Sequence, residues 1–137
     1  CWALEGVAQT IDQLAGLELS LDGEISVALY RMYVRARTNA LSYLEKGEMT
    51  TEEAIHFMEK YAPHKSPEDL GKELMQGTTD PLWRAYLPIY GISDYEMMLL
   101  ASNLSSDGRR EKLLPQILSR PMDRKQLSRL PYGGLLA

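Results

Sequence analysis

The sequence predicts an all-α fold, an orthogonal array of six or seven short-to-medium helices with one long helix. Apolar residues recur at spacings of three and four along most of the chain, which is the period of an amphipathic helix. Helix-start signals, Ser, Thr or Asp followed by Pro or by an acidic residue three positions on, precede several of these runs. No segment alternates apolar and polar residues for long enough to predict a β-strand.

The first two helices are expected from periodicity. Residues 2–19 form the first, and its apolar face is Leu4, Val7, Ile11, Leu14 and Leu17. The long helix follows, with Asp22 as its N-cap and its end near Gly47. Its apolar stripe comprises Ile25, Ala28, Leu29, Met32, Tyr33, Ala36, Ala40, Leu41 and Leu44.

The next two helices are expected from their capping residues. Thr50 and Glu53 have the spacing of a capping box, in which each side chain accepts a backbone N–H of the other residue. This third helix should stop before Pro63. Ser66 followed by Pro67 predicts the start of a fourth helix, which should end at Gly77.

Prolines and caps also divide the second half of the chain. Asp80 before Pro81 predicts a fifth helix, and Pro88 should limit it to about two turns or kink it. Ser93 and Glu96 repeat the capping-box spacing and predict a new helix start.

The C-terminal part is expected to be more broken. Residues 105–108 should form a loop, and residues 109–119 a helix interrupted at Pro115. Residues 123–130 should form a last short helix. Together with the length of 137 residues, this predicts a single helical domain over 1–130 and a flexible tail over 131–137.

Composition limits the partners and the compartment. The single cysteine, Cys1, excludes an internal disulfide and fits a reducing compartment, so the cytoplasm is expected. No apolar run approaches the roughly 20 residues of a membrane span, so no membrane partner is expected. Residues 109–137 carry seven Lys and Arg against two Asp and Glu. This basic segment could bind an acidic partner, but no nucleic-acid motif is present, so a nucleic-acid partner is not expected.

No motif in the sequence makes a complete catalytic centre. Glu53 and His56 have the Glu-x-x-His spacing of di-iron bundles, but such sites need two of these motifs and further carboxylates. The alternative is an exposed histidine on an amphipathic helix. There is no His-Glu-x-x-His motif and no nucleophile elbow, so the sequence predicts no metal ligands and identifies no catalytic residue.

The segment from Pro81 to Gly91 is the most unusual stretch. The candidate substrate-binding residues are Arg84, Tyr86 and Tyr90. An Arg side chain can bind a carboxylate through two hydrogen bonds, and Tyr hydroxyls can donate hydrogen bonds to an oxyanion. The alternative is that Trp83 and Leu87 pack inward while Arg84 caps a helix or pairs with an acid.

Several local stretches resemble a large prokaryotic family of helical, gluzincin-like zinc metallopeptidases, formerly a domain of unknown function. Residues 2–4, Trp-Ala-Leu, are similar to a Glu-Gly-Trp-Ala-Leu run whose Glu is the expected third metal ligand of that family. Residues 47–57, Gly-Glu-Met-Thr-Thr-Glu-Glu-Ala-Ile-His-Phe, are similar to a family turn and helix that follow an arginine-bearing helix. Pro81, Tyr86 and Gly91 look like a further family motif with shifted spacing. The chain departs at Leu41 and Glu45, where the family has Asp and His.

The resemblance implies that this chain is the C-terminal helical portion of a zinc-metallopeptidase-like protein. The chain has no initiator Met and begins inside a predicted helix, so it is expected to be a fragment. Zinc would then be held by the missing N-terminal part of the parent, and this part would line the cleft for a peptide substrate. Alone, the chain is expected to be inactive. The alternative is a free-standing helical protein-interaction module.

Overall fold

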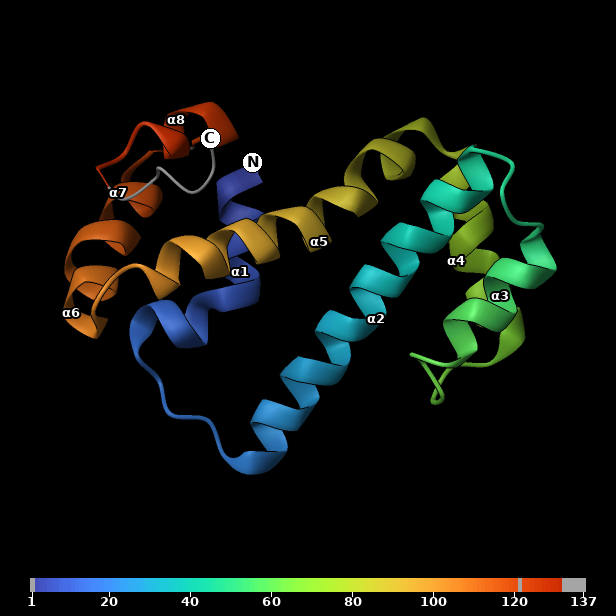
Figure 1. Ribbon diagram of the computed structural model, residues 1–137, viewed down its shortest axis with the longest axis horizontal. Helices are drawn as coiled ribbons and strands as arrows, with labels where there is room; N and C mark the ends of the chain where they lie inside the picture. Colours follow the sequence, from blue (N-terminus) through green and yellow to red (C-terminus); the bar gives the residue numbers. More distant parts are fainter. Residues whose placement is uncertain (1, 121, 132–137) are drawn as a thin grey trace. The chain divides into compact units, whose positions relative to one another are not determined.

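The structure is a computed structural model that describes residues 2–120 and 122–131 (Figure 1). Every regular element within these residues is a helix and none is a strand, so the predicted all-α class is confirmed. None of the helices in this part of the chain combines the length and the apolar character that a membrane span requires. The predicted flexible tail lies outside the described residues, apart from residue 131.

Contacts divide the chain into two compact units. Unit 1 comprises Cys1–Leu19 with Ile92–Ala137, and unit 2 comprises Ser20–Gly91. Each unit has its own cluster of buried apolar side chains. The single domain expected over residues 1–130 therefore stays a prediction, and the two units are considered one at a time.

Unit 2 is built from α2 (Leu21–Glu45), α3 (Thr51–Glu59), α4 (Pro67–Thr79) and the first part of α5 (Pro81–Ser102). Its buried cluster is drawn from all four helices and the loop after α3: Tyr33, Val34, Ala40, Leu41, Ala54, Met58, Ala62, Leu70, Leu74 and Leu87. The small residue Gly77 lets α4 approach α2, because a Cβ there would lie 2.6 Å from Leu41 Cδ2.

The helix starts of unit 2 follow local capping chemistry. Thr50 and Glu53 form the predicted capping box, with bonds of 3.2 Å and 2.8 Å, and Ser66 caps α4 ahead of Pro67. The predicted N-cap Asp22 is wrong: Ser20 is the cap, and its hydroxyl accepts from Gly23 N–H. Asp22 instead lies in the first turn, where a carboxylate is favoured by the helix dipole.

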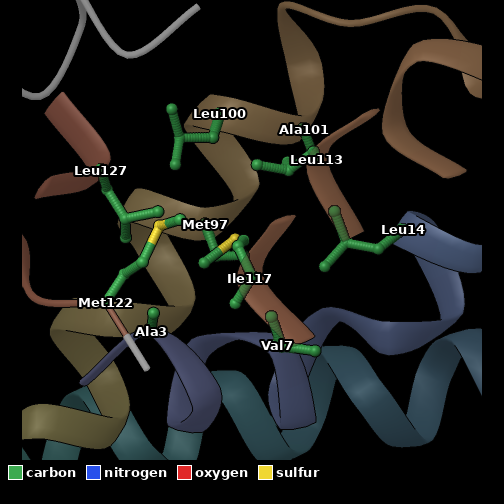
Figure 2. Packing of buried hydrophobic residues seen from close by; sticks show 10 residues of the cluster. All are labelled: Ala3, Val7, Leu14, Met97, Leu100, Ala101, Leu113, Ile117, Met122 and Leu127. Carbon is green, nitrogen blue, oxygen red and sulfur yellow. The ribbon is translucent and has the colours of Figure 1, made fainter. Parts of the chain in front are cut away.

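Unit 1 is built from α1 (Trp2–Ala15), the rest of α5, α6 (Ser106–Gly108), a π-helical turn (Arg109–Leu113), α7 (Leu114–Ser119) and α8 (Arg124–Ser128). Figure 2 shows its buried cluster, to which α1, α5, the π-helical turn, α7, α8 and the segment between α7 and α8 contribute: Ala3, Val7, Leu14, Met97, Leu100, Ala101, Leu113, Ile117, Met122 and Leu127. Leu4, Ile11 and Leu17, which were predicted on the apolar face of the first helix, are exposed, whereas Val7 and Leu14 are buried. α1 is kinked at Thr10, whose buried hydroxyl donates to Gly6 C=O at 2.8 Å, and it ends at Ala15, before Leu17.

Helix α5 differs from the prediction. It continues past Pro88 to Ser102, so the chain has two long helices in its described part, not one. Ser93 is fully buried inside α5 and does not cap a new helix. The physical reason is close packing with α1, where a Cβ on Gly6 would lie 2.6 Å from the Ser93 carbonyl oxygen.

The segment after α5 is more helical than predicted. The expected loop at residues 105–108 contains α6, and Ser105 accepts from Gly108 N–H at 3.1 Å. The helix that follows is interrupted before Pro115, as a π-helical turn in which Leu114 N–H bonds Arg109 C=O. Asp123 caps α8 through a second capping box with Gln126.

Candidate functional site

Three aromatic rings form a ladder on one side of α5 in unit 2. Trp83, Tyr86 and Tyr90 are spaced by three and four residues, so the helix brings them to one face. Trp83 and Tyr86 meet edge-to-face with ring centroids 6.2 Å apart, and Tyr86 and Tyr90 do so at 5.1 Å. All three are half-buried, and Trp83 and Tyr90 pack against the buried cluster of unit 2. The aromatic ladder is therefore packed against the core of unit 2 and still partly open to solvent.

The ladder borders a small apolar pocket. Leu82, Trp83 and Tyr86 line a hollow of about 170 Å³ with no polar atom on its accessible wall. Leu82 is 73% exposed, so the pocket opens to solvent. This volume is below the roughly 300 Å³ at which small-molecule sites begin, and it suits one apolar side chain. The sequence named Tyr86 and Tyr90, but it did not single out Leu82 as part of a binding surface.

Arg84 lies away from the ladder. It follows Trp83 by one residue, which turns it about 100° round the helix. Its guanidinium pairs with Glu45 at the end of α2, and both side chains are exposed. The alternative interpretation of this segment predicted that Arg84 pairs with an acid and that Leu87 packs inward. Both features are present, since Arg84 pairs with Glu45 and Leu87 is buried.

A second cluster of polar groups lies between α2 and α4. The Tyr33 hydroxyl donates to the Glu73 carboxylate, and Lys65 Nζ donates to Tyr33 Oη at 2.8 Å and to both Glu73 oxygens at 3.2 Å. Arg37 Nη1 is 3.4 Å from Glu73 Oε1. One carboxylate therefore holds three donors from α2 and from the loop before α4. We call these four residues the Glu73 cluster.

Burial and hydrogen bonding shift the pKa values of two members of the Glu73 cluster, Tyr33 and Lys65. Burial and the bond to Glu73 raise the pKa of Tyr33 above its ordinary value of 10.0, against the lowering effects of Lys65 and Arg37. Partial burial alone would lower the pKa of Lys65, but its bonds to Tyr33 and Glu73 outweigh burial and raise this pKa above 10.5. The phenol is therefore neutral and the ammonium charged at neutral pH, and neither is poised for proton transfer there.

The Glu53 and His56 pair does not form a metal site in the structure. Glu53 accepts the Thr50 N–H, and this bond and the Thr50 hydroxyl lower the pKa of the Glu53 carboxyl. His56 is exposed and lies 3.2 Å from Glu59, three residues along α3. Within residues 2–120 and 122–131, no three His, Cys, Asp or Glu side chains are grouped so as to hold a metal ion.

The basic segment is partly engaged inside unit 1. Arg109 Nη1 donates to the carbonyls of Ala101 and Leu104 at 3.0 and 3.1 Å, which caps the end of α5. Arg124 pairs with the buried Glu96 at 2.7 Å. These bonds hold the basic segment against other residues of unit 1. Two of its arginines therefore have a structural role, which could not be assigned from the sequence.

Comparison with protein-family models, with curated proteins and with solved structures gave no match. The resemblance to gluzincin-like peptidases therefore stays a prediction. The geometry offers one surface suited to a ligand among those the sequence named, the aromatic ladder with its apolar pocket.

Proposed function

We propose that this chain is the C-terminal helical portion of a zinc-metallopeptidase-like protein and supplies part of its peptide-binding cleft. The observation that carries the peptide-binding step is the aromatic ladder beside an apolar pocket of about 170 Å³. The peptidase context is supported by the resemblance at residues 2–4 and 47–57. The cytoplasm is the proposed compartment, on the basis of the single cysteine.

The described residues do not fit a zinc site, since no group of three suitable side chains occurs among them. In the proposed parent protein, the metal ligands would come from outside these residues. This chain would bind and orient the peptide. An apolar side chain would enter the pocket between Leu82 and Trp83, and the rings of Tyr86 and Tyr90 would contact the neighbouring peptide backbone.

The proposal also gives Arg84 a role, which is to bind a carboxylate of the substrate. An exposed ion pair such as Arg84–Glu45 contributes only about 0–1 kcal/mol, so a substrate carboxylate could replace Glu45 at little cost. If Arg84 contributes in this way, Glu45→Gln should tighten binding of acidic peptides, and Arg84→Gln should weaken it. Neither variant should change binding of a neutral peptide.

The proposal is tested by titrating the purified chain with short blocked peptides that differ only in one central residue, Leu, Phe, Ala or Glu. The Leu and Phe peptides should bind with Kd on the order of 10–100 µM, and the Ala peptide should bind much more weakly. Tyr86→Ala should weaken the Leu peptide about tenfold. Tyr95→Ala, at an exposed tyrosine of unit 1, is the matched control and should leave binding unchanged. Equal binding of all four peptides, or equal effects of both variants, would remove the ladder as the site.

The alternative function is a free-standing helical module that binds a partner through the same ladder. Both functions predict that this chain binds peptides equally well in added zinc and in a chelator, so zinc does not distinguish them. The reading frame upstream of Cys1 separates them. A His-Glu-x-x-His helix in that frame supports the peptidase, and a start codon directly before Cys1 supports the module.

A further inference from the structure

The first half of α2 carries an exposed apolar stripe. Leu21, Ile25, Leu29 and Met32 recur at spacings of four and three, which places them along one side of the helix. Leu21 is 71% exposed and Met32 is 47% exposed, and all buried residues of α2 lie from Tyr33 onward. The sequence predicted a buried apolar stripe along the whole helix, but only its second half is buried. We call the exposed half the α2 stripe.

The α2 stripe leads into a pocket between α2 and α3. Met32 is the last residue of the stripe and also the first wall of this pocket, which has a volume of about 190 Å³. The remaining walls are provided by Arg35, Ala36, Asn39, Phe57 and Tyr61. The rings of Phe57 and Tyr61 are tilted toward each other with centroids 5.4 Å apart, and Ala36 contributes a small, buried side chain. We call this hollow the α2–α3 pocket.

Size and lining indicate the kind of occupant. The volume is too small for a cofactor of ordinary size, which needs roughly 300 Å³ or more, and matches one large apolar side chain. The pocket shares no lining residue with the hollow beside the aromatic ladder. Because the stripe continues from the pocket along about three turns of α2, a ligand that fills both needs apolar groups at helical spacing. An amphipathic helix meets this requirement, with one side chain as anchor.

The arginines at and near the α2–α3 pocket favour a partner helix that carries acidic residues. Arg35 lines the pocket and Arg31 lies one turn before it, whereas the only acids of α2 before Glu45 are Asp22 and Glu24 in its first turn, at the end of the stripe far from the pocket. A guanidinium has five N–H donors, so Arg35 can hold a carboxylate of a partner alongside partners that it has in the chain. Asn39, which also lines the pocket, can donate to the same kind of acceptor.

We propose that the α2 stripe and the α2–α3 pocket bind an amphipathic helix of a partner protein, whose apolar anchor enters the pocket next to acidic residues. This surface goes beyond the proposed peptide cleft, since it lies on different helices. Its three turns are a small contact, so the complex is a transient one with micromolar affinity.

The experiment uses the full chain and two fluorescent synthetic helices of roughly four turns. Both probes have the same Leu and Phe face, and they differ only in their flanking residues, which are Glu in one and Lys in the other. Anisotropy should show the Glu probe binding with Kd on the order of 10–100 µM and the Lys probe binding at least about tenfold more weakly. Met32→Glu should weaken the Glu probe roughly tenfold, and Arg35→Gln should reduce the discrimination between the two probes.

The matched control is Met75→Glu. It also replaces an exposed methionine of unit 2 by an acid, but Met75 lies on α4 and lines neither pocket, so it should leave binding unchanged. Circular dichroism of each variant establishes that its helices are intact. The proposal is overturned if the two probes bind equally, if neither binds, or if Met32→Glu and Met75→Glu have the same effect. It is also overturned if sedimentation shows a dimer that Met32→Glu converts to a monomer, because the occupant is then a second copy of the chain.

Discussion

At the scale of single residues, the Glu73 carboxylate is the centre of a hydrogen-bond cluster in unit 2. It accepts from Tyr33, Lys65 and Arg37 at once, and it is about one-quarter exposed. Glu73→Gln removes the charge that these donors share while keeping the size of the side chain. We expect the free energy of unfolding to fall by about 1–3 kcal/mol, as for hydrogen bonds to charged groups. Urea unfolding followed by circular dichroism measures this loss.

A neighbouring ion pair provides the control for Glu73→Gln. Lys72 and Glu68 lie 2.7 Å apart on α4, but both side chains are more than two-thirds exposed. Lys72→Gln should therefore change the free energy of unfolding by no more than about 0.5 kcal/mol. Similar losses for the two variants would show that the Glu73 cluster contributes no more than a surface ion pair.

Tyr33 makes the stability of unit 2 depend on pH in the alkaline range. The raised pKa means that the folded protein holds this proton more tightly than the unfolded chain does. The resulting stabilisation is complete below pH 10.0 and is lost as the pH rises through the raised value, and Lys65 acts in the same direction. Tyr33→Phe should therefore be less stable at neutral pH, but should lose less of its remaining stability between about pH 9 and pH 11. Urea unfolding across this range tests the difference, and parallel pH profiles would contradict it.

At the scale of helices, the contact between α1 and α5 in unit 1 depends on a missing side chain. A Cβ on Gly6 would lie 2.6 Å from the Ser93 carbonyl oxygen and 3.2 Å from Met97 Cβ. Because the obstacle is backbone, Gly6→Ala should force the helices apart and lower stability by about 1–3 kcal/mol, despite the better helix propensity of Ala. Thermal unfolding measures the change.

Gly71→Ala is the control for this close approach. Gly71 lies in the interior of α4, and a Cβ there would meet only the end of the Ile55 side chain at 3.3 Å. It should be neutral or stabilising by up to about 1 kcal/mol, since Ala loses less backbone entropy in a helix. If Gly6→Ala is equally well tolerated, the close approach of α1 to α5 is not required for the fold.

Comparison of the helices shows which features can be read from sequence. Thr50 and Ser66 were correctly predicted as caps, because a cap depends on three or four consecutive residues. Ser93 and Glu96 have the same spacing, yet no helix begins there, because packing of α5 against α1 in unit 1 favours a continuous helix through this point. Pro88 was expected to limit this helix to about two turns or to kink it, and α5 continues past Pro88 to Ser102, although proline cannot donate a backbone hydrogen bond. Local signals therefore gave the starts of α3 and α4 correctly, but they placed the cap of α2 two residues late and indicated a start at Ser93 that α5 does not have.

The candidate sites differ in the same way, because some follow from local sequence and others depend on tertiary contacts. Tyr86 and Tyr90 are four residues apart, so the helical period alone placed them on one face. The Glu73 cluster joins Tyr33 to residues 32 and 40 positions later, and no pattern in the sequence marks that encounter. The α2–α3 pocket is also formed by two helices and a small residue on its floor. Such features require the tertiary structure.

At the scale of the whole molecule, unit 2 is a continuous segment with a closed core. All buried members of its apolar cluster lie within residues 33–87, which belong to unit 2. We therefore expect residues 20–91, produced alone, to be helical and to unfold cooperatively in urea, with a low stability of a few kcal/mol because small domains bury proportionally less surface. Glu73→Gln should destabilise this fragment as it does the full chain. A fragment that lacks a cooperative transition would instead support the single domain predicted over residues 1–130, because the unit 2 core would then be insufficient by itself.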